Sequence, residues 1–181
     1  MLIARGKKTE NIAEYLLYMW QIEDLIRAFA FDIEKIQTYI IDGYEQPIEV
    51  KQEIRDWYES LIEMMRLENV TAGGHLQLNK NVITELDELH KLLLSLPKEN
   101  FYLMTYHKVL PLIVELRAKP GGKAYGEVET CLNLLYGMLL LRLQKKEISD
   151  ETAHAASLIS EFLRMLSAKY KQEKQEGLDL E

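Results

Sequence analysis

The chain has 181 residues, 48% of them hydrophobic and 28% charged, and its formal net charge is −7. This length favours one domain with a core of its own, and the apolar fraction excludes a disordered chain. The acidic balance argues against nucleic acid or an anionic membrane as the main partner. Cys131 is the only cysteine, which excludes an internal disulfide framework and a zinc cluster of several thiolates.

The sequence contains no segment typical of export or membrane insertion. Its start, up to Thr9, has basic residues but lacks the apolar run of a signal peptide. The longest apolar run covers residues 134–141 and stops at Arg142, well short of the roughly 20 residues that cross a bilayer. We therefore expect a cytoplasmic protein with no membrane partner and with Cys131 reduced.

Apolar residues recur at helical spacing along almost the whole chain, and strict alternation never persists beyond a few residues. This pattern predicts an all-α fold, a single-domain bundle of six or seven helices over residues 1–181. We expect about residues 9–176 to be ordered and the polar end, residues 177–181, to be frayed.

The first predicted helix is long, and Thr9 is a suitable N-cap for it. The helix either continues to residue 42 or bends near Phe31, where Asp32 would cap a second segment. A heptad repeat like that of coiled coils is compatible with both alternatives. One position of this repeat is filled by Ile12, Met19, Ile26, Ile33 and Ile40.

Prolines and glycines delimit the next three helices. The second begins at Pro47, which suits a first helical turn, and ends near Asn69. The third stops at Pro97. The fourth covers about residues 98–118 and contains Pro111, which predicts a kink.

The fifth predicted helix, about residues 125–146, is apolar nearly all round between Cys131 and Leu141. Such a pattern is typical of a central helix that others surround. Ser149 is then placed to cap a sixth helix, which has Asp150 and Glu151 in its first turn.

One pattern resembles the ligands of di-iron helical bundles, which use Glu-x-x-His pairs. Glu151 and His154 form one such pair, and Asp87 with His90 imitates a second. At about 100° per residue, however, His154 and Asp87 lie roughly 140° from the apolar stripes of their helices, so they face away from the core. We therefore predict no metal site and no cofactor.

No catalytic set is apparent in the sequence. His75 follows two glycines and His107 lies among apolar and aromatic residues, but neither is paired with a base or nucleophile. Cys131 lies in the most apolar helix, where burial raises the pKa of a thiol and keeps it inert. Residues 121–123, Gly-Gly-Lys, lack the first glycine and the preceding strand of a phosphate-binding loop. We predict no catalytic residue.

The back of the first helix is the strongest candidate for a functional surface, because a helix packed on one side only should be polar there. Either the helix is sandwiched inside the monomer, or its back forms a homodimer or partner interface with Trp20 and Phe31 as anchors. The apolar residues opposite the heptad repeat are Ala13, Leu17, Trp20, Ala28 and Phe31.

A resemblance lies in the same helix. Residues 11–21 read Asn-Ile-Ala-Glu-Tyr-Leu-Leu-Tyr-Met-Trp-Gln, and residues 24–28 read Asp-Leu-Ile-Arg-Ala. In these segments, and over nearly the whole chain, the sequence resembles an uncharacterised family of small bacterial helical proteins, a domain of unknown function. The resemblance implies a bacterial, single-domain, all-helical protein. It assigns no activity, substrate or catalytic residue.

We therefore expect a non-enzymatic helical interaction protein, which self-associates or binds a protein partner through its first helix. The alternative is a small-ligand- or metal-binding bundle, with or without enzymatic activity. In that alternative, Tyr102, Tyr106 and His107 line a pocket beside the kink expected at Pro111, because kinks open space between helices.

Overall fold

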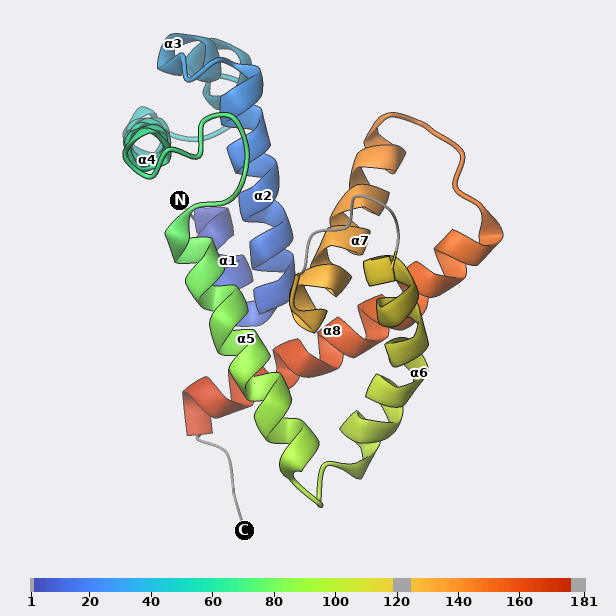
Figure 1. Cartoon of the computed structure of the whole chain (residues 1–181). Coiled ribbons are helices and arrows are strands. Elements are labelled where there is room, and N and C mark those ends of the chain that lie inside the picture. Colours follow the sequence, from blue (N-terminus) through green and yellow to red (C-terminus); the bar gives the residue numbers. More distant parts are fainter. Residues whose placement is uncertain (1, 119–124, 177–181) are drawn as a thin grey trace.

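The computed structural model describes residues 2–118 and 125–176, which form eight α-helices and one π-helical turn (Figure 1). The predicted all-α, single-domain fold is confirmed, with eight helices in place of six or seven. Within the described residues, no helix is long and apolar enough to cross a membrane. The fraying predicted at 177–181 and the glycine-rich segment at 121–123 lie outside the described residues.

A short helix that the sequence did not predict, α1 (Leu2–Glu10), precedes the long one, and Thr9 lies inside it. The N-cap of α2 (Ile12–Ala28) is Asn11. Its Oδ1 accepts from the backbone N–H groups two and three residues later, at 3.1 and 3.2 Å. The prediction of Thr9 as the N-cap is therefore wrong, because Asn11 satisfies the first free N–H groups of α2.

The long helix ends at residue 28, because Ala30 and Phe31 adopt positive φ angles of 53° and 62°. A left-handed conformation at two non-glycine residues interrupts an α-helix. Asp32 then caps α3 (Ile33–Ile36), and the π-helical turn η1 (Gln37–Ile41) follows directly. Of the two alternatives, the bend near Phe31 is correct.

Prolines delimit the next two helices as predicted. α4 (Ile48–Leu67) begins directly after Pro47, and α5 (Gln77–Ser95) ends before Pro97. We call the residues between these two helices, 68–76, the connector. Both helices bury the apolar stripes seen in the sequence, including Tyr58, Leu61, Met65, Leu86, Leu89 and Leu93.

The last three helices also follow the prediction in outline. α6 (Asn100–Ala118) contains Pro111, and α7 (Glu127–Leu143) is followed by α8 (Asp150–Glu176). The predicted cap of α8 is confirmed, since the hydroxyl oxygen of Ser149 accepts from a backbone N–H in the first turn at 3.3 Å.

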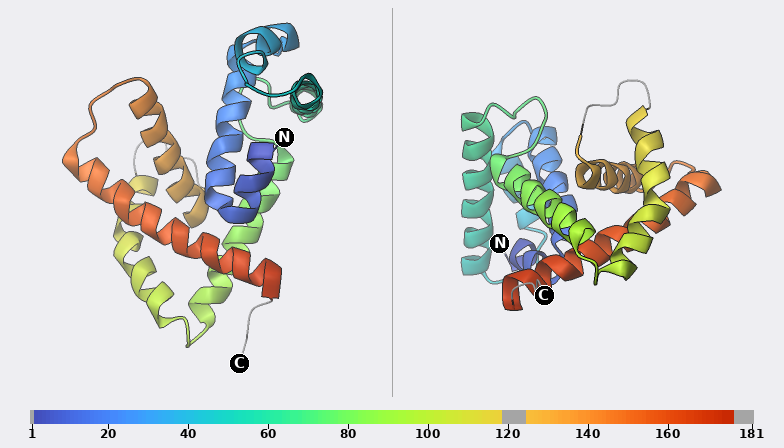
Figure 2. Two further views of the ribbon diagram at one scale, coloured as in Figure 1. Left: turned by 180° about the vertical axis from the view of Figure 1, so that it is seen from behind. Right: turned by 60° about the horizontal axis from the view of Figure 1, so that its bottom comes forward.

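α8 crosses the other long helices and joins the two halves of the molecule (Figures 1 and 2). α2 and α5 pack on one part of it, and α6 and α7 pack on another. α1 lies beside α2, while α3 and α4 lie at the far end of α2. The largest fully buried side chains come from four different helices: Trp20, Tyr58, Tyr102 and Phe162.

α7 is a central helix only in its N-terminal half. Val128, Cys131 and Leu132 are fully buried, as the prediction requires. The three leucines at 139–141 are only half-buried, and Leu143 is 68% exposed. Figure 1 shows that α7 diverges from α2 toward this end. For the C-terminal half, the prediction of a helix surrounded by others is therefore wrong.

Candidate functional site

The five residues predicted to form a partner interface do not share one surface. Ala13 and Trp20 are buried, with 6% and 1% of their surface exposed. Leu17 and Phe31 are half-buried, and Ala28 is exposed. At Ala13 and Trp20 the helix is sandwiched inside the monomer, which was the alternative to a partner interface.

Trp20 is covered by two aromatic side chains from other parts of the fold. The ring of His75, in the connector, stacks on it with the ring centres 4.2 Å apart and an angle of 14° between the planes. Tyr136 of α7 meets the same ring edge-on, at 5.5 Å between centres. The pattern of the first helix could not reveal this cover, because both partners belong to distant elements.

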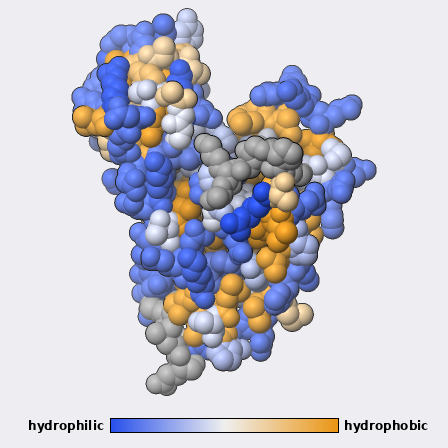
Figure 3. All heavy atoms as spheres, in the orientation of Figure 1, coloured by the Kyte–Doolittle hydropathy of each residue, from blue (hydrophilic) through white to orange (hydrophobic). Residues whose placement is uncertain are grey.

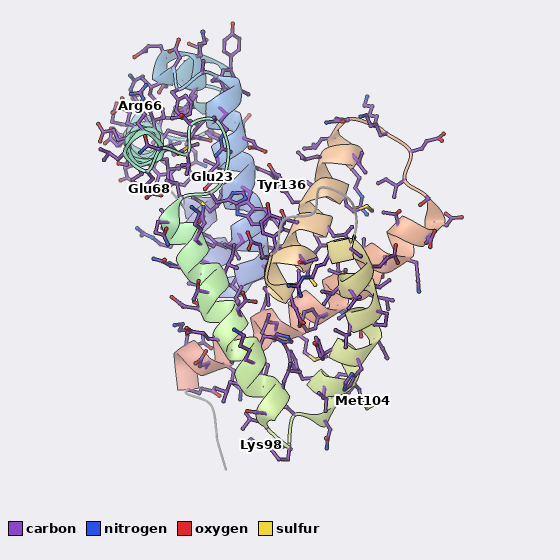
Figure 4. The ribbon with its side chains drawn as sticks, viewed as in Figure 1. Glu23, Arg66, Glu68, Lys98, Met104 and Tyr136 are labelled. Atoms are coloured by element: carbon purple, nitrogen blue, oxygen red, sulfur yellow. The ribbon has the colours of Figure 1, made fainter. Side chains whose placement is uncertain are left out.

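Glu23, one turn beyond Trp20, is a fully buried carboxylate that the sequence did not reveal as a site (Figure 4). Its Oε1 accepts from the backbone N–H of Leu76 at 3.0 Å and from Nδ2 of Asn79 at 2.7 Å. Its Oε2 accepts from Nδ1 of His75 at 2.7 Å. These donors offset the cost of taking a carboxylate out of water. The one signal in the sequence was a glutamate on a helix that is apolar on both faces.

Arg27 and Asp24 continue this network along α2. The guanidinium of Arg27 donates to the carbonyl of Val70 at 3.0 Å and to that of Gly74, and it pairs with Asp24 at 2.7 Å. The Tyr136 hydroxyl donates to Asp24 at 2.5 Å. One stretch of α2 thus binds the connector, the start of α5 and the middle of α7. We call this set the Glu23 network: Glu23, Asp24, Arg27, His75, Asn79 and Tyr136.

A histidine held by a buried carboxylate is an arrangement that many general bases share. Nucleophilic catalysis also needs a hydroxyl or thiol beside the histidine that it can activate. Among the described residues, His75 contacts the Glu23 carboxylate and the Trp20 ring, and no hydroxyl or thiol bonds to it. The Glu23 network therefore joins helices and does not contain an activated nucleophile.

His90 is the centre of a second buried network, between α5, α6 and α7. Its Nε2 lies 3.2 Å from the Glu127 carboxylate, and its Nδ1 lies 2.7 Å from the Tyr102 hydroxyl. Because a carboxylate only accepts, Nε2 carries the proton and Nδ1 accepts from Tyr102. The rings of Tyr106 and Phe162 pack edge-on against the imidazole.

Burial favours the neutral forms of the imidazole, the phenols and the thiol around His90. Desolvation lowers the pKa of His90 and raises the pKa of Tyr106 and of Cys131 to about 12. It also raises the pKa of Tyr102. A nucleophile or general acid needs a pKa near the working pH, and these shifts move the phenols and the thiol away from it. The His90 network thus has the properties of a packed structural core.

The two metal-like pairs do not come together in the fold. Burial raises the pKa of Asp87, and the nearby backbone N–H of Val128 at the start of α7 opposes this rise, whereas Glu151 and His154 are exposed on α8. Gly126 leaves room for Asp87, since a Cβ at this position would lie 2.6 Å from a carboxylate oxygen of Asp87. In the described part of the chain, no group of three His, Cys, Asp or Glu residues could hold a metal.

Tyr102, Tyr106 and His107 do not line a common pocket. Tyr102 and Tyr106 are buried, whereas His107 is exposed on the outer side of α6. Figure 3 shows apolar patches on the exposed side of this helix as well. This version of the ligand-binding alternative is therefore wrong, because the three side chains do not face one space.

A groove of about 560 Å³ lies between α1, α2, α7 and α8. The left view of Figure 2 shows these four helices from behind. This volume falls in the range of roughly 300–1,000 Å³ that ligand sites occupy. Leu17, one of the predicted interface residues, lines the groove, and it lies on α2 beside Tyr18. The opposite wall and the floor come from Leu135, Met138 and Leu139 of α7 and Ala153, Ala156, Ser157 and Ser160 of α8.

The charges on the lining of the groove do not balance. Lys7 and Glu14 form an ion pair with 2.9 Å between Nζ and Oε2, and so neutralise each other. The guanidinium of Arg142, in the last turn of α7, makes no hydrogen bond or ion pair with any residue that the structure describes. The groove therefore combines apolar walls with one uncompensated positive charge.

The fold defines a single-domain, all-helical protein. Its two polar networks are buried between helices, whereas the groove beside α7 is open to solvent. Residues 1–177 match the family described as a domain of unknown function, DUF4924, so the chain belongs to that family. The resemblance noted in the sequence is thereby confirmed. No curated protein and no solved structure matches the chain.

Proposed function

We propose that this protein is a non-enzymatic interaction protein, which binds an apolar helical segment of another protein molecule in the groove between α2 and α7. The first helix of the prediction keeps its role in this proposal, because α2 supplies Leu17 and Tyr18 to one wall. The proposal also keeps the expectation that the protein is bacterial and cytoplasmic. A second copy of the chain is one form that the bound molecule can take.

The observation that carries the proposal is the apolar C-terminal half of α7. The three leucines at 139–141 are only half-buried and do not belong to the continuous core cluster, although they lie in the most apolar stretch of the chain, and Leu139 lines the groove. Leaving such side chains in partial contact with water forgoes roughly 25 cal/mol per Å² of apolar surface. Amphipathic helices of partners bind in grooves that combine an apolar wall with polar side chains.

The two polar networks support a non-enzymatic role. In the Glu23 network, the imidazole of His75 is engaged by Glu23 and Trp20. In the His90 network, burial raises the pKa of Tyr106 and of Cys131 to about 12, which favours their unreactive protonated forms.

Photo-cross-linking in the native cell tests the proposal. A photoreactive phenylalanine derivative replaces Leu139, which lines the groove, and in a second strain it replaces Leu67, which is 81% exposed at the end of α4. We expect discrete covalent adducts from position 139 and none of the same mass from position 67. An adduct of twice the chain mass identifies a second copy.

The same adducts from both positions, or none from position 139, would contradict the proposal. Leu139→Ala serves as a folding control, because Leu139 lies outside the core cluster. Its unfolding free energy is expected to stay within about 1 kcal/mol of the unsubstituted protein, as for a partly exposed side chain.

A further inference from the structure

We infer that the segment bound in the groove is an acidic amphipathic helix of a protein partner, with its carboxylates directed at Arg142. This inference rests on the proposed function and adds the chemistry of the partner. It depends on the balance of charge in the groove, on the polar side chains beside Arg142 and on the length of the two walls.

The charge of the groove is opposite to that of the whole chain. The charges of Lys7 and Glu14 cancel within their ion pair, so the lining has a net positive charge from Arg142. The chain as a whole has a formal charge of −7. A carboxylate is the group that complements a guanidinium best, because it accepts two parallel hydrogen bonds.

Uncharged polar groups lie in the same lining as Arg142. Gln21 of α2 and the hydroxyls of Ser157 and Ser160 of α8 belong to it. Amide and hydroxyl groups donate hydrogen bonds to carboxylates, and they add no negative charge that would repel one. The apolar part of the lining is formed by Leu17 of α2 and by Leu135 and Leu139 of α7, the helix that also carries Arg142.

The length of the walls fits a short helical segment. The α2 wall extends from Glu14 to Gln21, and the α7 wall extends from Leu135 to Arg142. At 1.5 Å per residue, each wall is about 10 Å long, which corresponds to about two turns of an α-helix. Two apolar side chains one turn apart on a partner helix would contact the leucines, and a carboxylate on the following turn would reach Arg142.

Two synthetic helical peptides with the same leucine positions test the inference. One carries glutamate at its polar positions and the other lysine, and fluorescence anisotropy measures their binding to the full chain. The acidic chain attracts the lysine peptide at long range, so a preference for the glutamate peptide reports the groove itself. We expect the glutamate peptide to bind about 10-fold more tightly, as one charge-assisted hydrogen-bonded pair provides.

Substitutions assign the preference to the groove. Arg142→Glu is expected to remove or invert it, whereas Arg164→Glu, the same change at an exposed site on α8, is expected to leave it intact. Leu139→Ala is expected to weaken the binding of both peptides, because it removes apolar contact area from the groove. Urea unfolding of each variant shows that the fold is retained.

The outcomes separate the inference from the proposed function. If both peptides bind equally, or the lysine peptide binds better, and Leu139→Ala still weakens them, the groove binds helices but the acidic partner is wrong. If neither peptide binds saturably, the inference fails, and cross-linking from position 139 decides the proposed function independently. A dimer in light scattering that Leu139→Ala dissociates would assign the groove to a second copy and overturn the inference.

Discussion

At the scale of single residues, the buried polar side chains of this protein act by joining helices. Glu23 accepts from the connector and from α5, and His90 bridges Tyr102 of α6 and Glu127 of α7. In each case the buried polar group has hydrogen-bond partners from other elements, which offset the cost of its desolvation. Removing one partner leaves the others unsatisfied, which makes these residues sensitive positions.

We expect His90 to make the stability of the protein sensitive to acid. Burial lowers the pKa of His90 in the folded state, so the unfolded chain takes up a proton at higher pH than the native protein does. As the pH falls below the ordinary histidine value of about 6.5, the unfolding free energy should decrease, by at most about 1.4 kcal/mol per pH unit. Urea unfolding at a series of pH values measures this slope.

His90→Gln removes the titrating group and is expected to flatten this slope. His154→Gln is the matched control, because His154 is exposed on α8. A slope that survives His90→Gln, or that disappears in His154→Gln, would show that another group is responsible.

At the scale of elements, helix ends are decided by individual side-chain hydrogen bonds. The heptad repeat of the first helix predicted its buried face, and Ile12, Met19 and Ile26 are indeed buried. The same repeat continues through Ile33 and Ile40 without a break, although the helix ends before them. Apolar periodicity thus predicts which face of a helix is buried more reliably than where the helix ends.

The two candidate caps at the start of α2 can be compared directly. Asn11→Ala removes the acceptor for two backbone N–H groups and is expected to lower the unfolding free energy by about 1 kcal/mol. Thr9→Ala is expected to change it by less than about 0.5 kcal/mol, because Thr9 only bonds back within α1. Chemical denaturation measures both. Equal losses in the two variants would contradict the assignment of the cap to Asn11.

At the scale of the whole molecule, the Glu23 network connects the α3–α4 end to the rest of the fold. Glu23→Ala leaves the N–H of Leu76, the amide of Asn79 and the ring of His75 without their acceptor. We expect a loss of about 3 kcal/mol in unfolding free energy, as for a broken buried network. Hydrogen exchange should also become faster at Leu76, because its N–H is then free.

Glu68→Ala is the control for this prediction. Glu68 also accepts a backbone N–H at the start of α5, from Gln77, but its carboxylate is exposed (Figure 4). Water replaces an exposed acceptor at little cost, so we expect a loss below about 1 kcal/mol. Similar losses in Glu68→Ala and Glu23→Ala would mean that burial of Glu23 is not what stabilises the junction.

The candidate site illustrates how far the sequence could be interpreted. Leu17 was identified from the apolar back of the first helix, and it does line the groove. Trp20, from the same pattern, is instead covered by His75 and Tyr136. The two residues are three positions apart and equally apolar in context, so only the placement of distant segments distinguishes them.

The sequence by itself determined the all-α class, the buried faces of the helices and several of their ends, because these depend on local spacing, prolines and caps. Only the tertiary structure decided that Glu23 is buried with His75, that α7 leaves its last leucines partly exposed, and that Arg142 faces the groove. Those features depend on contacts between residues far apart in the chain. A periodic pattern shows which side chains are apolar, but which other residues bury them depends on the tertiary structure.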